Sequence, residues 1–131
     1  MLNSMPRFPF TATHRSIDIT VWDVGGQDSL RPFWRNYFAV GTGAIVYVVD
    51  STDQERLAIA RDELAALLRE EVLSDVPIAI VANKQDVRYS LTPEVVAQCT
   101  FIPDSSLTLF TKNSQVWLAV HFLFLSEKHS L

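Results

Sequence analysis

The sequence is short of several residue types, and each shortage excludes a class of protein. Cys99 is the only cysteine, so no intrachain disulfide can form, and a reducing intracellular compartment fits this composition. The three histidines, at positions 14, 121 and 129, lack the spacing of metal ligands. The longest apolar run, residues 116–125, is interrupted by His121 and has about half the length that a membrane-spanning helix needs.

Positive charge and targeting signals are scarce as well. The chain has 11 Lys and Arg against 15 Asp and Glu, a net charge of −4, and its basic residues are scattered. This balance argues against a nucleic-acid partner. Residues 1–10 contain Pro6 and Pro9 and no continuous apolar segment, so no signal peptide is evident. Leu2 occupies the position where N-myristoylation requires glycine.

The apolar pattern predicts a single α/β domain from the 131 residues, of which 48% are hydrophobic. Residues 17–22 alternate between apolar and polar, which predicts a half-buried strand. Residues 44–49 and 78–82 are continuous apolar runs, typical of parallel strands covered on both faces. A helix between these two runs predicts a right-handed crossover and a parallel pair. Residues 107–110 fit a strand, and 116–125 fit either a strand or a short buried helix.

Three helices are predicted between and after these strands. The first has Pro32 in its first turn and one apolar face. This face consists of Leu30, Phe33, Trp34, Tyr37 and Phe38, and we expect Phe33 and Phe38 to lie in the core. The second begins with a capping box of Thr52 and Glu55 and buries Leu57, Ala60, Leu64, Leu67 and Leu68. The third begins with Thr92 as cap and Pro93 at the first position, and turns Val95, Val96 and Cys99 inward.

Two polar motifs follow predicted strands directly. Asp23-Val24-Gly25-Gly26-Gln27 follows the first strand, and Asn83-Lys84-Gln85-Asp86 follows the strand at 78–82. Ligands of open α/β sheets bind at the carboxyl ends of strands, so both motifs are candidate binding residues. The alternatives are an ordinary turn or helix-capping aspartate for Asp23 and an ordinary surface turn for 83–86.

The two motifs resemble the G3 and G4 motifs of small GTPases. The longer text WDVGGQ…RPFWRNYF, residues 22–27 and 31–38, resembles the ADP-ribosylation factor (Arf and Arf-like) family more narrowly. The resemblance covers about residues 17–98. It implies a three-layer small-GTPase fold with a mostly parallel sheet, and a GTP-binding switch that acts in intracellular membrane traffic. It also implies GTP or GDP and Mg²⁺ as cofactors, effector and regulator proteins as partners, and a place in the cytosol or on endomembranes such as the Golgi.

The resemblance also implies roles for individual residues. Asp23 matches the aspartate that reaches Mg²⁺ through a water, and the N–H of Gly26 matches a contact to the γ-phosphate. Gln27 matches the residue that orients the attacking water in GTP hydrolysis, a role that needs a neutral amide. In the family, such loops order around the γ-phosphate and relax when it leaves.

The second motif, NKQD at 83–86, matches the family's guanine-binding motif in every specified position. The Asp86 carboxylate would accept two hydrogen bonds from guanine, a pair that adenine cannot supply. Asn83 would brace the loop, and the stem of Lys84 would lie along the ring. Trp22 and Tyr37 match two of the three aromatic residues that Arf-family proteins present to effectors, and aromatic clusters of this kind are typical binding anchors.

One essential part of the family pattern is missing from this sequence. The phosphate loop G-x-x-x-x-G-K-[ST] is absent, because all four glycines lie between 25 and 43 and the lysines are only Lys84, Lys112 and Lys128. Its charge-assisted bonds are worth roughly 1.5–3 kcal/mol each. Losing about three or four of them weakens nucleotide binding by on the order of 10⁴ or more. In the family, the strand before that loop lies between the strands matching 17–22 and 44–49. Without it the two strands must pair directly, another segment must fill the gap, or the sheet is open.

Three hypotheses remain from the sequence. The first is an incomplete Arf-like GTPase that is poor in GTP binding and hydrolysis, divided into a lead-in (1–16), a family-like core (17–98) and a divergent segment (99–131). The second is a module that binds effector proteins without nucleotide. The third is a truncated product without function. Membrane attachment is not expected, because the family's lipid anchor and its helix have no match in this sequence.

Overall fold

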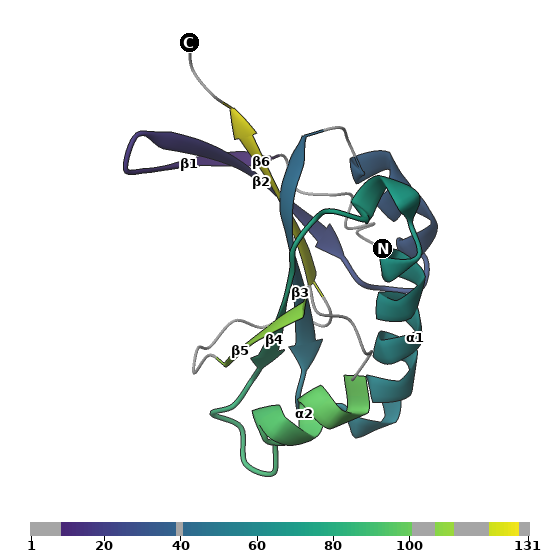
Figure 1. Cartoon of the computed structure of the whole chain (residues 1–131). Helices are drawn as coiled ribbons and strands as arrows, with labels where there is room; N and C mark the ends of the chain where they lie inside the picture. Colours follow the sequence, from purple (N-terminus) through teal and green to yellow (C-terminus); the bar gives the residue numbers. More distant parts are fainter. Residues whose placement is uncertain (1–8, 39–40, 101–106, 112–120, 129–131) are drawn as a thin grey trace.

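The structure is a computed structural model that describes residues 9–38, 41–100, 107–111 and 121–128. Its central element is a six-stranded sheet with the order β1-β2-β6-β3-β4-β5 (Figure 1). The strands are β1 (Phe10–His14), β2 (Ile17–Gly25), β3 (Thr42–Asp50), β4 (Ile78–Asn83), β5 (Leu107–Thr111) and β6 (His121–Lys128).

Helices lie against one face of this sheet in the described part of the chain (Figure 1). They are α1 (Leu57–Leu68), α2 (Pro93–Thr100) and the short 3₁₀ helices η1 (Arg31–Tyr37), η2 (Gln54–Arg56) and η3 (Glu71–Leu73). The described residues therefore supply the sheet and one helical layer of the predicted three-layer fold.

The strand directions agree with the predicted fold class. β3 pairs in parallel with β4, and β4 with β5. β6 is antiparallel to both β2 and β3, so β2 runs in the same direction as β3, and only β1 and β6 run the opposite way. The α/β class and the parallel pair across α1 are confirmed, and four strands of the six share one direction.

β6 fills the gap that the sequence left open in the middle of the sheet. Its backbone pairs with β2 from Asp18 to Gly25 on one side and with β3 from Thr42 to Val48 on the other. Of the apolar run 116–125, residues 121–125 belong to this strand, and 116–120 lie outside the described residues. A segment from the far end of the chain thus joins the two halves of the sheet.

The core lies between the sheet and α1. Alternate residues of β3 and β4 face it and are buried, among them Ile45, Tyr47, Val49, Ile78 and Ile80. The predicted stripe of α1 meets them, with Leu57, Ala60, Leu64 and Leu67 buried and Leu68 packed against the cluster.

Tyr47 donates a hydrogen bond from its hydroxyl to the carbonyl of Ala60 at 2.7 Å, which ties α1 to the sheet. Burial, with the nearby Glu63 charge, raises the pKa of the Tyr47 phenol, so it stays a neutral donor.

Residues on the other face of β3 and β4 are less covered than predicted. Val46, Val48, Ala79 and Val81 are half-buried, whereas their neighbours toward the helices are almost fully buried. The prediction that β3 and β4 are fully covered on both faces is therefore wrong. The described helices all pack on the opposite face, which accounts for the difference.

Several local predictions about buried side chains need correction. Phe33 is 56% exposed, whereas Trp34 is buried and Phe38 packs against the core. The segment is a 3₁₀ helix with about three residues per turn. The apolar face predicted for an α-helix with about 3.6 residues per turn therefore does not coincide with the side that is buried. Cys99 and Val95 are also exposed, and only Val96 of the predicted inward residues of α2 is buried.

The predicted helix starts fare differently. Thr92 accepts the Val95 N–H at its hydroxyl, and Pro93 is the first residue of α2, as predicted. Thr52 does not form a capping box with Glu55, because its hydroxyl and its backbone N–H both donate to Asp50. Asp53 caps the segment instead, accepting the N–H of Arg56.

A proline in β6 tests its central position. Leu123 lies opposite Asp23 of β2 and Val46 of β3, and proline removes a ladder N–H in a strand that has neighbours on both sides. We expect Leu123→Pro to abolish cooperative urea unfolding, while Ala12→Pro in the edge strand β1 keeps it. Equal unfolding curves for Leu123→Pro and the parent protein would contradict the central placement of β6.

Candidate functional site

The first motif forms a tight turn at the carboxyl end of β2. Gly25 is the last residue of the strand, Gly26 is buried, and Gln27 is exposed. The carbonyl of Gln27 accepts the N–H groups of Leu30 and Arg31, at 2.8 and 3.2 Å. A Cβ on Gly25 would lie 2.8 Å from a terminal methyl of Leu30, so a larger residue here would have to displace the end of that side chain.

Two side chains from η1 hold the carbonyl groups of this turn. The Trp34 indole donates to the carbonyl of Gly25 at 3.0 Å, and Arg31 Nε donates to the carbonyl of Gly26 at 3.1 Å. Arg31 also pairs with Asp28 at 3.0 Å and with Glu63 of α1 at 3.1 Å. The turn is thereby fixed both to the helix that follows it and to α1.

The second motif continues β4 and is tied to the end of β3. Lys84 Nζ lies 2.6 Å from Asp50 Oδ2, with 24% and 14% of the two side chains exposed. Thr52 adds two hydrogen bonds to Asp50 Oδ1, from its N–H at 2.9 Å and its hydroxyl at 2.6 Å. Burial raises the pKa of Asp50, but the bonds from Lys84 and Thr52 outweigh it, and the net pKa lies below the ordinary 3.8. Asp50 is therefore a carboxylate at neutral pH.

A second set of contacts holds the same loop from the other side. The Gln85 amide donates to the hydroxyl of Ser51 and to the carbonyl of Leu91, both at 2.9 Å. The N–H of Leu91 in turn donates to the carbonyl of Ser51 at 2.8 Å. Asn83 and Ser51 are buried. We call Asp50 and Ser51, together with Lys84, Gln85 and Leu91, the loop bracket.

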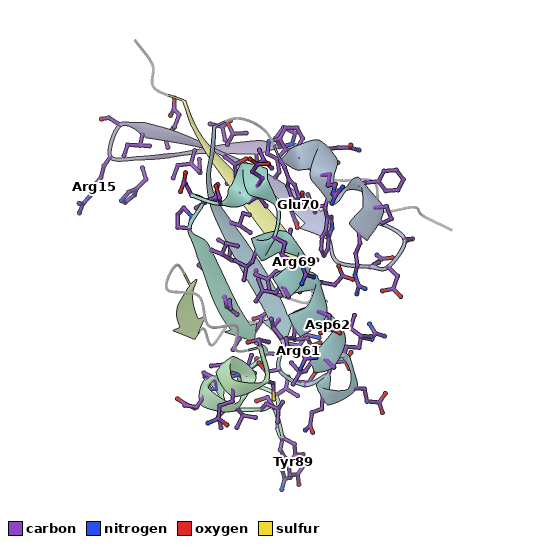
Figure 2. All side chains as sticks on the ribbon, turned by 45° about the vertical axis from the view of Figure 1, so that its right-hand side comes forward. Arg15, Arg61, Asp62, Arg69, Glu70 and Tyr89 are labelled. Atoms are coloured by element: carbon purple, nitrogen blue, oxygen red, sulfur yellow. The ribbon has the colours of Figure 1, made fainter. Side chains whose placement is uncertain are left out.

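The bracket leaves part of the second motif at the surface. Asp86 is exposed, and its carboxylate has no hydrogen bond or ion pair among the described residues. Lys84 and Tyr89 have positive φ values of 62° and 68°, which residues other than glycine rarely adopt. Tyr89 is 80% exposed and points away from the body of the protein (Figure 2). The loop is thus shaped by the protein itself, with one carboxylate open to a ligand.

The two motifs lie at the same end of the sheet, where β2, β3 and β4 terminate, but they are not side by side. His121 of β6 lies opposite both Gly25 of β2 and Val48 of β3, and Asp50 pairs with Asn83 of β4. Going from the end of β2 to the end of β4 therefore crosses three strand spacings, about 14 Å. Such a separation suits a ligand that is elongated along this edge.

The predicted nucleotide site fits its ligand only in part. The open Asp86 carboxylate suits the donors of a guanine base. Among the described residues the phosphate half has no unpaired cation: Arg31 and Arg56 line this region and are both held by carboxylates. Asp23 is half-buried, and no cluster of three His, Cys, Asp or Glu side chains lies among the described residues. Because Mg²⁺ is bound by one or two carboxylates plus phosphates, Asp23 would need a held phosphate beside it.

The two predicted partner-binding aromatics do lie together. The rings of Trp22, from β2, and Tyr37, from η1, have centroids 5.5 Å apart and planes inclined by 54°. Both are half-buried and pack against the core cluster on one side. Inclined rings at this spacing are a favourable aromatic pair. The pair is therefore rigidly mounted and still partly accessible.

Of the five residues of the loop bracket, only Lys84 was given a role from the sequence; Leu91 carried no signal. Asp50 and Ser51 end the apolar run of β3, and Gln85 is the unspecified position of the NKQD motif. A polar triplet at 50–52 directly after a buried strand was the available signal. Its partners lie more than thirty residues away, as the 34-residue separation of Asp50 and Lys84 shows, so local pattern could not pair them.

The fold and the strand-end loops together define a protein of the small-GTPase class. The model of the ADP-ribosylation factor family matches residues 4–118, more of the chain than the motifs alone covered. The chain is 49% identical over 79 residues to ADP-ribosylation factor-like protein 1 of Caenorhabditis elegans, which covers 60% of this chain and 43% of that protein. It is 48% identical over 80 residues to ADP-ribosylation factor-like protein 1 of Drosophila melanogaster, covering 61% and 44%. The chain belongs to the ADP-ribosylation factor family, and its match spans less than half the length of these relatives.

None of the helices among the described residues combines the length and the apolar character that crossing a bilayer requires.

The Asp50–Lys84 pair yields a prediction about stability and pH. Asp50→Asn leaves the Lys84 ammonium without its carboxylate, and charged hydrogen bonds are worth about 1.5–3 kcal/mol. We expect the free energy of unfolding to fall by about this amount at pH 7, measured by urea denaturation. Because the folded pKa of Asp50 is lowered, its stabilisation is present above the unfolded value and is lost as pH falls below 3.8.

The same measurement needs a matched control and a pH series. Asp75→Asn changes an exposed carboxylate in the same way and should be nearly neutral. The difference between the parent protein and Asp50→Asn should be nearly full at about pH 5 and shrink as the pH is lowered from about 4 toward 2, roughly the range below the unfolded pKa. A difference that stays constant over this range would show that the pair does not stabilise the fold as an ion pair.

Proposed function

We propose that this chain acts as an Arf-like binding module that engages a partner protein through Trp22 and Tyr37 and does not depend on bound GTP. The observation that carries the proposal is the place of β6. At the edge where Gly25 and Asp50 end their strands, β6 begins rather than ends. In the family the phosphate loop follows the strand between those that match β2 and β3, and here the strand in that place has its amino end at this edge.

The aromatic pair supports the proposal from a second direction. Trp22 belongs to a strand paired on both sides, and Tyr37 belongs to η1, which Arg31 and Trp34 tie to the turn. These contacts are made by groups of the protein itself. A binding surface that is ordered by internal contacts loses little conformational entropy on association.

Guanine recognition is the second candidate function, favoured by the loop bracket. The bracket orders the NKQD loop and leaves Asp86 accessible, so selectivity for guanine can persist at low affinity. We place Gln27, Gly26 and Asp23 in the family's roles toward water, phosphate and Mg²⁺ only if another molecule supplies the phosphate grip. We do not propose that the chain alone hydrolyses GTP. We do propose that it acts in membrane traffic, in the cytosol or at endomembranes.

Nucleotide titration tests the second candidate. A fluorescent guanine nucleotide with Mg²⁺ should bind the monomeric protein no more tightly than roughly 100 µM, since losing on the order of 10⁴ in affinity leaves little of a tight site. Whatever binding remains should vanish in Asp86→Ala and for an adenine nucleotide. Submicromolar, guanine-selective binding would overturn the proposed independence from GTP.

Partner capture tests the first candidate. Trp22→Ala and Tyr37→Ala remove the aromatic anchors, and anchor residues typically cost more than 1–2 kcal/mol, about tenfold or more in affinity. We expect both variants to lose proteins that the parent chain retains from a cytosolic extract, with or without added GTP. Tyr89→Ala is the control, because this exposed aromatic lies at the far end of the protein (Figure 2). Retention that requires GTP, or that is unaffected by Trp22→Ala, would contradict the proposal.

A further inference from the structure

One face of the sheet has no helix against it in the described part of the chain. α1, α2 and the 3₁₀ helices all pack on the other face (Figure 1). We call the uncovered side of the strands β1-β2-β6-β3-β4 the open face. Strand register fixes which residues belong to it, because residues that lie opposite one another in neighbouring strands share a face. Its members on β2, β3 and β4 include Ile17, Ile19, Val46, Val48, Ala79 and Val81.

The open face presents apolar side chains that keep accessible surface. Ile17 is 42% exposed, and Phe10, which lies on the same face of β1, is 53% exposed. Val46 and Val48 in the middle of the sheet are half-buried, whereas their neighbours toward the helices are almost fully buried. Soluble monomers rarely expose a contiguous apolar patch of more than a few hundred Å². The open face is therefore a candidate interaction surface.

The charged residues that β2, β3 and β4 place on the open face lie at the end that carries the two motifs. Alternation puts Asp23 and Asp50 there, and Asp50 is paired with Lys84. These three strands put no Lys or Arg on the open face. An anionic membrane surface is therefore an unfavourable partner for this chain, whose net charge is −4. A second copy of the chain meets no like charges over the apolar part, which suits a two-fold contact in which the same patch meets itself.

The dimensions of the open face suit a small dimer interface. β1 and β4 are four strand spacings apart, about 19 Å, and the six residues of β4 span about 20 Å. The flat area is about 400 Å². Side chains that stand out of the sheet enlarge it, so two such faces bury on the order of 1,000 Å² together, which is typical of weak complexes. We propose that the open face is the contact between two copies of this chain, packed sheet on sheet at about 10 Å.

This contact is separate from the aromatic pair of the proposed partner site. Trp22 packs against the core cluster on the helical side of the sheet, next to Tyr37 of η1. A dimer through the open face therefore leaves the aromatic pair accessible, and the loss of either contact leaves the other intact.

Sedimentation velocity of the full chain over a concentration series tests the proposed dimer. We expect monomer in the low micromolar range and a growing dimer fraction above it, with a Kd of roughly 10–100 µM. Ile17→Lys and Val46→Lys bring an ammonium group into the apolar contact, where it has no carboxylate partner. Each should raise the dimer Kd at least tenfold. Circular dichroism checks that each variant is folded, and Ile17→Lys, at the more exposed position, decides alone if Val46→Lys is not.

Two substitutions on the helical side are the matched controls. Ile59→Lys changes an isoleucine of α1 that is 42% exposed, the same fraction as Ile17, and Val72→Lys changes an exposed valine of η3. Both should leave the dimer Kd unchanged. A parent chain that stays monomeric at about 1 mM, far above the expected Kd, would overturn the proposal, even if it floats with uncharged phosphatidylcholine vesicles. Association that Ile17→Lys and Ile59→Lys weaken equally, or that proceeds beyond the dimer, would also overturn it.

Discussion

The pairing of β6 with β2 and β3 is the constraint on which the rest of this structure depends. β2 carries the turn with Gly26 and Gln27, and β3 and β4 carry the loop bracket, but no described hydrogen bond joins β2 directly to β3. β6 supplies the backbone partners for both. An unpaired β2 and an unpaired β3 would each expose a row of N–H and C=O groups, which invites association with other chains. The strand therefore completes the sheet and also sets the distance between the two motifs.

The direction of β6 matters as much as its position. A strand that ran parallel to β2 and β3 would end at the edge where their polar residues gather, and its following loop could contribute backbone N–H groups there. β6 runs the other way, so the chain enters the sheet at that edge and leaves at the opposite one. The same sheet order can thus be completed without the feature that grips phosphate.

The two ends of the site owe their order to different interactions. The turn after β2 is held by η1 and α1 through Trp34 and Arg31, mostly by hydrogen bonds to carbonyl groups. The NKQD loop is held by the Asp50–Lys84 ion pair and by the Gln85 amide. Both sets of contacts are made between groups of the protein itself.

Local pattern was sufficient for the parts of the fold that depend on neighbouring residues. The strands around Ile19, Ile45 and Ile80 follow from alternation and from apolar runs, and the stripe of α1 follows from its 3.6-residue period. The prediction failed at Phe33, because the pattern cannot distinguish a 3₁₀ helix from an α-helix. It failed at Cys99 because α2 is short and buries only Val96 and Thr100.

The sequence by itself determined the family and the two strand-end motifs, because each is a matter of residue type at short spacing. Only the tertiary structure decided what fills the middle of the sheet, and which residue pairs with Lys84. Both depend on contacts between residues far apart in the chain, such as Gly25 with His121 and Asp50 with Lys84. Those contacts are selected by backbone pairing and burial over the whole fold, which no local spacing records.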